Sequence, residues 1–295
     1  MKTTGLLIVL MLVLGMVNAQ ELSPFYNAGN LKGGVDEVGE TVTQKLKEKG
    51  FEILGSYHPE NSKFLKVIAF TRPDLKNVCS QVEDRGMLAA ALKVGLKRIA
   101  DGKTLVTLLN PDYLFHAYLR DDVKKHQAAL NKVSRDAKAA VKSLAGKLIP
   151  FGGKIDVDDL KDYHYMAFMP YFTDHVEVGE FESFEEGLAT IRKNLSARKG
   201  ETVKVFEIVD NGKKVAVFGV GLLHKDDGEA FFLPIIGEKH LAALPYELIL
   251  EGKEATILPG RFRFALFWPE LSMSEFMKIV QTPGDVEDFM EGLCE

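Results

Sequence analysis

The segment with the most chemically capable side chains is the run Tyr163-His164-Tyr165-Met166-Ala167-Phe168-Met169-Pro170-Tyr171, followed by His175. Imidazole nitrogen and thioether sulfur are soft ligands suited to copper or haem iron. As a β-strand, this segment would place His164, Met166 and Phe168 on one face. His164 and Met166 are therefore the candidate metal ligands. The alternative is a strand buried on both sides, in which methionine fills the core.

A second group of possible ligands follows one of the expected strands. It contains His224, Asp226, Asp227 and Glu229. Carboxylate oxygens with one imidazole can hold a divalent cation. The alternative is a solvated acidic turn.

No familiar catalytic signature occurs in the sequence. It contains no Walker loop, no Gly-x-Ser-x-Gly, no His-Glu-x-x-His and no Cys-x-x-Cys. Glu238 and His240 lie in an irregular stretch of the kind that often carries function, but nothing makes them an acid–base pair. No residue is predicted to be catalytic, and no cofactor is specified beyond the metal or haem alternative.

Aromatic residues gather in the last third of the chain. They are Phe231, Phe232, Phe262, Phe264, Phe267 and Trp268. On a strand from residue 261 to 267, Arg261 and Arg263 would face away from the phenylalanines. An apolar wall with a cationic rim suits an amphipathic or anionic ligand. The alternative is a sheet with one core face and one charged, solvated face.

The first 19 residues resemble a cleavable secretory signal. Lys2 precedes an apolar run from Leu6 to Val17 that is too short for a permanent span, and Asn18 and Ala19 complete a cleavage site before Gln20. The expected product is a soluble periplasmic or secreted protein, and the alternative is an uncleaved membrane anchor. Without Lys2, 36 of the 37 basic residues remain against 42 acidic ones, for a net charge of −6. This balance disfavours a nucleic-acid partner or an anionic membrane surface, and no later apolar run predicts a membrane span.

Only two cysteines are present, Cys79 and Cys294. An oxidising compartment would permit a disulfide between them, but two cysteines do not make a disulfide scaffold. Both the bridged and the free states remain open at this point.

Periodicity and turn signals predict an α+β protein. In the N-terminal part, helices are expected over residues 35–49, 72–82 and 121–148, and strands over 51–57, 64–70, 88–99, 104–109, 163–172 and 175–181. In the C-terminal part, helices are expected over residues 184–198, 272–280 and 284–293, and strands over 203–209, 215–220, 244–250, 255–258 and 261–267. The basic side of the long helix is a solvated surface or a partner-facing one.

The two parts share an order of helix, hairpin, linker, hairpin and helices. Leu88-Ala89-Ala90-Ala91-Leu92 before one hairpin is similar to Leu241-Ala242-Ala243-Leu244 before another. We therefore expect two tandem, possibly duplicated domains, each a mixed or antiparallel sheet with helices on one face. The expected boundaries are 1–19 for the signal peptide, 20–34 for an extended lead-in, 35–181 for the first domain and 182–295 for the second.

Gly50-Phe51-Glu52-Ile53-Leu54 after an amphipathic helix, and a later strand–turn–strand that ends at Asn110-Pro111, resemble a small bacterial and archaeal α+β family. It is the domain-of-unknown-function family three-hundred-and-two. The resemblance covers residues 35–120 and, more faintly, 184–268. It implies a helix packed on a mixed sheet and the ability to dimerise. Where many relatives carry a Pro-Cys pair, this chain has Pro245 followed by Tyr246, so no catalytic residue is carried over.

Together these features favour an exported, non-catalytic protein that binds an unidentified small ligand or associates with an envelope protein. The alternative is a metal- or haem-dependent redox accessory or enzyme that uses the His164 and Met166 region. A third possibility is an interaction module that presents the helix at residues 121–148.

Overall fold

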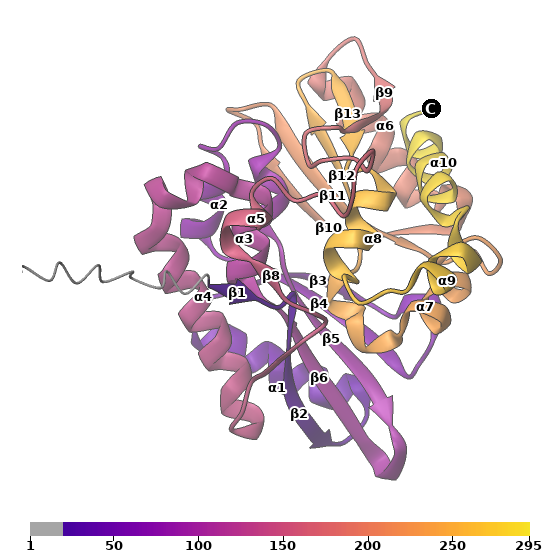
Figure 1. Cartoon of the computed structure of the whole chain (residues 1–295). Helices are drawn as coiled ribbons and strands as arrows, with labels where there is room; N and C mark the ends of the chain where they lie inside the picture. Colours follow the sequence, from indigo (N-terminus) through magenta and orange to yellow (C-terminus); the bar gives the residue numbers. More distant parts are fainter. Residues whose placement is uncertain (1–19) are drawn as a thin grey trace, which may run out of the picture.

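The computed structural model describes residues 20–295 and has the predicted α+β class, with two large antiparallel sheets and helices packed against each (Figure 1). A third sheet has only two short antiparallel strands, β1 and β8. The predicted signal peptide lies outside the described residues. Over residues 20–295, no helix combines the length and the apolar character that crossing a bilayer requires.

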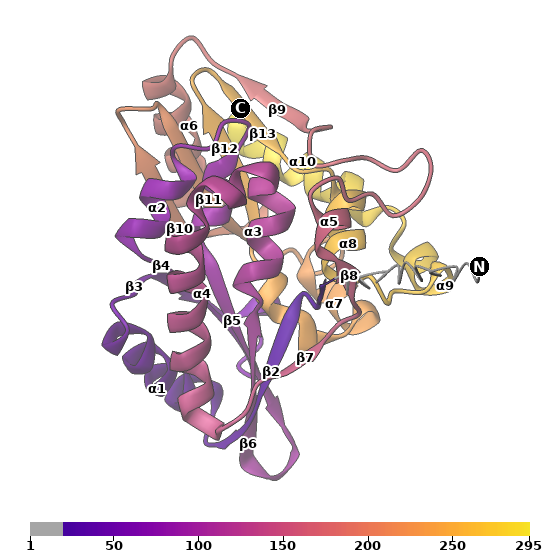
Figure 2. The same ribbon diagram turned by 60° about the vertical axis from the view of Figure 1, so that its left-hand side comes forward.

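The N-terminal sheet has six strands in the order β3-β4-β5-β6-β2-β7. Figure 2 shows α1 and α4 side by side along this sheet. The elements of this part are β1 (Glu21–Leu22), β2 (Phe25–Lys32), α1 (Val35–Glu48), β3 (Glu52–Tyr57), β4 (Leu65–Thr71), α2 (Pro73–Cys79), the 3-10 turn η2 (Gly86–Ala90), β5 (Leu92–Ile99), β6 (Lys103–Leu109), α3 (Pro111–Leu119), α4 (Val123–Ala145), β7 (Ile149–Phe151), β8 (Ile155–Asp156) and α5 (Val157–Leu160).

The C-terminal sheet has five strands in the order β10-β11-β12-β13-β9. Helices α6 and α10 pack against each other and against this sheet. The elements are β9 (Val176–Glu180), α6 (Phe184–Ser196), β10 (Thr202–Asp210), β11 (Val215–Leu222), α7 (Glu229–Ile236), the 3-10 turn η6 (Glu238–Ala243), β12 (Tyr246–Glu251), β13 (Glu254–Ile257), α8 (Gly260–Phe267), α9 (Met273–Phe276) and α10 (Thr282–Cys294).

The two sheets have the same topology. The first five strands of the N-terminal sheet have the same order as the five strands of the C-terminal sheet. The equivalent strands are β2 and β9, β3 and β10, β4 and β11, β5 and β12, and β6 and β13. Helices α1 and α6 follow the first strand of each set, and α3 and α8 follow the last. We call residues 25–119 and 176–267 the N-terminal and C-terminal halves.

Irregularities in the two sheets also fall at equivalent places. The β3–β4 pairing shifts opposite Ala69, and the β10–β11 pairing shifts opposite Gly219. On their other sides, Ala69 pairs with Lys93 and Gly219 pairs with Glu247. A further bulge lies in β2 and another in β9, each next to the last strand of its half. The halves therefore agree in register as well as in strand order, since a β-bulge pins the pairing around it.

Two glycines mark where the halves approach each other closely. A Cβ on Gly55 of β3 would lie 1.8 Å from the Val205 carbonyl oxygen of β10. A Cβ on Gly95 of β5 would lie 2.8 Å from the Leu241 Cβ of η6. A side chain is excluded at Gly55 by backbone of the other half, and at Gly95 by Leu241 and Ala242 of the other half together with the Thr107 hydroxyl. The edge strands and the turn η6 thus form a tightly packed contact between the halves.

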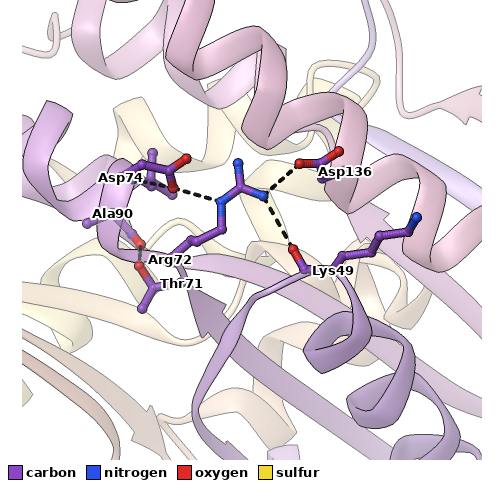
Figure 3. Close-up of polar contacts among 7 residues, drawn as sticks. Lys49, Thr71, Arg72, Asp74, Ala90 and Asp136 are labelled. Atoms are coloured by element: carbon purple, nitrogen blue, oxygen red, sulfur yellow. Dashed lines mark hydrogen bonds and ion pairs between the residues drawn. The ribbon is translucent and has the colours of Figure 1, made fainter.

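Arg72 joins the helices of the N-terminal half to its sheet (Figure 3). Its guanidinium donates to Asp74 at 2.7 Å, to Asp136 of α4 at 2.8 Å and to the Lys49 carbonyl oxygen at 3.4 Å. Arg72 is buried, so these acceptors offset the desolvation of its charge. One side chain after β4 therefore fixes α2, α4 and the end of α1.

Several predicted elements are correct, including α1 and the β5–β6, β10–β11 and β12–β13 hairpins. The stretch expected as an extended lead-in contains β2, which lies inside the N-terminal sheet between β6 and β7. Strand β9, expected to close the first domain, pairs with β13 of the C-terminal sheet. Sequence windows did not reveal either pairing, because β2 and β9 pair with strands that are distant in sequence.

Three other predicted elements are wrong. Residues 163–172 form a loop where a strand was expected, and residues 261–267 belong to helix α8. Residues 222–243, the stretch expected to be irregular, contain helix α7 despite its internal Pro234. In α8 the alternation of Arg and Phe resembles a strand pattern, but Arg263 is buried and its charge is satisfied inside the protein.

Candidate functional site

The loop at residues 161–175, called the 161–175 loop below, is attached to the body of the protein at two points. The Tyr163 hydroxyl donates to the Ala265 carbonyl oxygen of α8 at 2.9 Å. Phe172 is buried, and its ring lies 5.2 Å from that of Tyr118 and 6.1 Å from that of Phe262. The residues between these anchors are held over α8 at the surface.

Apolar side chains of the 161–175 loop are exposed between the two anchors. Phe168 is fully exposed with a positive φ of 67°, and Met166 is 50% exposed. Tyr165 is also exposed. Exposed apolar side chains that lie close together mark binding surfaces more often than isolated ones do.

The 161–175 loop and helix α8 form the two walls of an apolar pocket, with α9 at its end. The pocket is narrow, with about 450 Å³ of space between side chains, part of it open to solvent. We call it the methionine pocket. Its apolar lining includes Met166, Met169, Phe264, Trp268, Met273 and Phe276.

Arg261 is the charged residue among the side chains that line the methionine pocket. It stands at the exposed start of α8, while Phe264 and Trp268 further along the helix are buried. An apolar aromatic wall with a cationic rim is one of the two alternatives that the sequence leaves open, and the pocket has this composition. The wall is helical, however, and the opposite wall comes from the 161–175 loop.

The surface next to the methionine pocket is also apolar. Met273 is 51% exposed and Met277 is 59% exposed, and Val280 beyond them is exposed too. Methionine is flexible and polarisable, and it is common on surfaces that accommodate varied apolar partners. The mouth of the methionine pocket at Met273 is therefore suited to an apolar molecule, whereas Met277 and Val280 lie outside the pocket lining.

Met166 lines the methionine pocket, whereas the ring of His164 lies 4.5 Å from that of Tyr171 on the exposed loop. His164 is not among the residues that line the pocket. The assignment of His164 and Met166 as metal ligands stays a prediction.

The four residues considered as a possible cation site, His224, Asp226, Asp227 and Glu229, are not brought together. His224 approaches Asp227 at 3.3 Å, but Glu229 is buried and turned to a different partner. Over the described residues, no group of three or more His, Cys, Asp or Glu side chains is placed to hold a metal ion. The four residues are close in sequence but do not converge, because Glu229 begins helix α7 and its side chain points into the protein.

Glu229 instead connects the two halves. The Tyr57 hydroxyl of β3 donates to Glu229 Oε1 at 2.7 Å, and the Leu222 backbone N–H donates to the same oxygen at 3.2 Å. Burial raises the pKa of Glu229 to about 8, against the lowering effect of the hydrogen bond from Tyr57. The carboxyl group is therefore protonated at neutral pH, and its hydrogen bond with Tyr57 joins the start of α7 to β3.

A buried ionic cluster lies nearby. Lys93 of β5 donates to Glu247 of β12, and Arg263 of α8 lies 2.8 Å from the other Glu247 oxygen. Arg263 also donates to the Ala243 carbonyl oxygen at 2.6 Å. Burial lowers the pKa of Lys93, and the charge of Glu247 opposes that effect. Sequence reasoning missed this cluster because an isolated charge in a strand pattern is usually a solvent-facing one.

The chain matches no protein-family model and no curated protein. Among solved structures, it is similar to "uncharacterized conserved protein DUF302 from Bacillus stearothermophilus". That similarity has 14% sequence identity and a TM-score of 0.35, and it covers 41% of this chain and 98% of the other. A likeness this distant carries no conclusion about activity.

Proposed function

We propose that this chain is an exported, non-catalytic binding protein and that the methionine pocket holds an apolar or amphipathic ligand. The observation that carries the proposal is the pocket itself, which two segments about 100 residues apart build from apolar and thioether side chains. Ligand sites are mostly apolar concavities with a few polar groups, and this composition agrees with that pattern. The resemblance of residues 1–19 to a secretory signal supports export.

Trp268 provides a direct test, because it is the only tryptophan in the sequence and it lines the methionine pocket. Titrating the protein from residue 20 onward with decane should change the emission of Trp268 with saturation. The matched variants are Met273→Ser, inside the pocket, and Met277→Ser, on the neighbouring turn outside it. Both methionines are more than half exposed, so neither change should disturb the core.

Met273→Ser should weaken decane binding about tenfold, since it removes an apolar contact of roughly 1–2 kcal/mol. Met277→Ser should leave the affinity unchanged. Equal effects of the two variants, or no saturable change in wild-type emission, would rule out the pocket as the binding site. If the ligand is instead an envelope protein, the wild-type chain should capture that partner, and Met273→Ser should reduce the amount captured.

A soft metal ion is the second candidate ligand, and one observation favours it. Met166, Met169 and Met273 all line the methionine pocket, and thioether sulfur suits Cu(I). This proposal keeps Met166 as a ligand and leaves His164 as a candidate from the adjacent loop. Metal analysis and an absorption spectrum of the purified protein, with and without His164→Ala and Met166→Leu, test it. Stoichiometric copper or haem lost in both variants would support it, and a metal-free protein that takes up no Cu(I) would refute it.

We also propose that the two halves arose by tandem duplication of one α+β domain. The shared strand order, register and bulges support this origin. Such a chain would resemble a dimer fused into one polypeptide, with the halves related by a pseudo-two-fold axis. An alignment of related sequences in which the two halves become more alike would support duplication, and halves that diverge to unrelated patterns would contradict it.

A further inference from the structure

The exposed apolar side chains of the protein gather on one side of it. Of the ten large apolar side chains that are exposed over residues 20–295, seven lie in the 161–175 loop or in the segment 273–280. Figure 2 shows the loop between α5 and β9 projecting on the same side as α9. Met166 and Met273 line the same pocket, so the two segments are neighbours. We call the seven residues the apolar face: Tyr165, Met166, Phe168, Tyr171, Met273, Met277 and Val280.

Phe168 is the most exposed member of the apolar face. Its ring is fully exposed, so it adds nothing to the protein core. Its backbone has a φ of 67°, a conformation that bulky side chains rarely adopt. Backbone strain of this kind is typical of positions that serve a binding site. The exposure and the strain of Phe168 together indicate a contact outside the chain.

The tip of the 161–175 loop is free of charge. Residues 165–173 contain no Asp, Glu, Lys, Arg or His. A charged side chain is costly inside a bilayer, whereas tyrosine is enriched at the interface between lipid and water. The neighbouring segment 273–280 contains Glu275 and Lys278, one charge of each sign. Apolar contact, rather than the charge of a lipid head group, is therefore the interaction that this face offers.

The described chain begins next to the 161–175 loop. Strand β1 pairs with β8, and the Val157 N–H donates to the Gln20 carbonyl oxygen at 2.9 Å. Val157 begins α5, a short helix that leads directly into the loop. The apolar run Leu6–Val17 lies just before Gln20, and such a run enters the membrane during export. A precursor that leaves the bilayer at Gln20 therefore has the apolar face close to the membrane.

We propose that the apolar face docks the protein onto the surface of a lipid bilayer, with the Phe168 ring inserted among the acyl chains. A projecting ring and flexible methionines fit a fluid phase, which has no fixed shape to complement. Met273 belongs both to the apolar face and to the methionine pocket, so a docked protein would exchange an apolar ligand directly with the bilayer. This exchange rests on the proposed function, whereas the docking does not.

Flotation of the protein from residue 20 onward with phosphatidylcholine vesicles tests the docking. Wild-type protein should float with the vesicles, and about 0.5 M salt should not release it, because apolar contacts are not screened. Phe168→Asn should weaken the binding about tenfold or more, since a fully exposed phenylalanine no longer enters an apolar phase. Asparagine tolerates a positive φ, so this change should leave the fold intact.

A second variant and a matched control accompany Phe168→Asn. Met277→Ser removes another side chain of the apolar face and should weaken vesicle binding about threefold or more. Phe64→Asn is the control, because Phe64 is 54% exposed but precedes β4 of the N-terminal sheet. It should leave vesicle binding unchanged. Neither Phe168 nor Met277 lines the methionine pocket, so both variants should keep the decane response of Trp268.

The results separate the docking from the proposed function. Wild-type protein that does not float, or that floats only with vesicles containing phosphatidylglycerol and is released by salt, would overturn the docking. Equal losses in Phe64→Asn and Phe168→Asn would also overturn it. A wild-type dimer that Phe168→Asn converts to monomers, without vesicle binding, would show that a second copy covers the face instead. Vesicle binding without a decane response would refute only the proposed function, and the reverse result would refute only the docking.

Discussion

Lys93 and Glu247 occupy equivalent positions in the two halves and form an ion pair with each other. Each is the second residue of its strand, β5 or β12, and each pairs with the residue that lies opposite the bulge of its sheet. Both side chains are 2% exposed. The two equivalent positions carry opposite charges, so they attract each other and connect the halves. If the halves were identical in sequence, the same residue would stand at both positions and like charges would lie together.

Loss of Glu247 should destabilise the protein strongly. Glu247→Gln leaves Lys93 and Arg263 buried without their shared carboxylate, and breaking a buried ion pair in this way costs about 3–5 kcal/mol. Urea denaturation should show this fall in the free energy of unfolding. Glu177→Gln on the exposed side of β9 is the control and should change stability by less than about 0.5 kcal/mol. Similar values for both variants would show that the buried pair is not required.

Stability should decrease as the pH rises towards 8, because Glu229 has a pKa of about 8 in the folded protein against 4.5 as its ordinary value. Below 4.5 the carboxyl is protonated in both states, and its contribution is fully present. Between these values the unfolded chain releases a proton that the folded protein retains, so rising pH favours unfolding. The contribution is lost as the pH passes through the folded-state pKa. Burial also raises the pKa of Glu60, to about 7, which acts in the same direction.

Urea denaturation at about pH 5 and about pH 8.5 measures this dependence. Glu229→Gln should flatten most of it, and Glu60→Gln should remove a smaller part. Glu48→Gln, on an exposed carboxylate of α1, should leave the slope unchanged. A wild-type protein that becomes more stable over this range would contradict the assignment.

Both cysteines should be reduced in the purified protein. Cys79 and Cys294 are free thiols in the structure, so the disulfide that sequence left open is not formed there. Cys79 is buried, and burial raises its pKa and that of Cys294, the latter to about 12. An aromatic disulfide reagent should therefore react slowly with the native protein and with two thiols after denaturation. Two rapidly reacting thiols, or none in denaturant, would contradict this.

Export should remove the first 19 residues. When the full chain is expressed in a bacterium with a periplasm, the mature protein should begin at Gln20, as mass spectrometry of the purified product can establish. Ala19→Arg places a large charged residue at the cleavage position and should cause precursor to accumulate. Met16→Leu preserves the apolar run and is the control. A wild-type product that keeps residues 1–19 would support the alternative of a membrane anchor.

Local sequence was sufficient for elements whose signal is contained in a few neighbouring residues. The apolar spacing of α1, from Val35 to Leu46, predicts a helix with one buried side, and the helix has one. Asp101-Gly102 and Asn211-Gly212 predict the turns of two hairpins, which the structure contains. These signals work because helix periodicity and turn geometry depend on local backbone preference.

Tertiary contacts were decisive where the same local pattern fits more than one environment. The apolar run around Met166 satisfies a strand pattern but finds no neighbouring strand, and it is held as a loop by Tyr163 and Phe172. The local pattern around Arg263 predicts a solvent-facing side chain, but in the structure Arg263 lies on helix α8 and pairs with the buried Glu247 of strand β12. The methionine pocket requires the 161–175 loop and α8 to meet. No short window of sequence contains such a contact, because chain segments about 100 residues apart are brought together only by burial of the shared core.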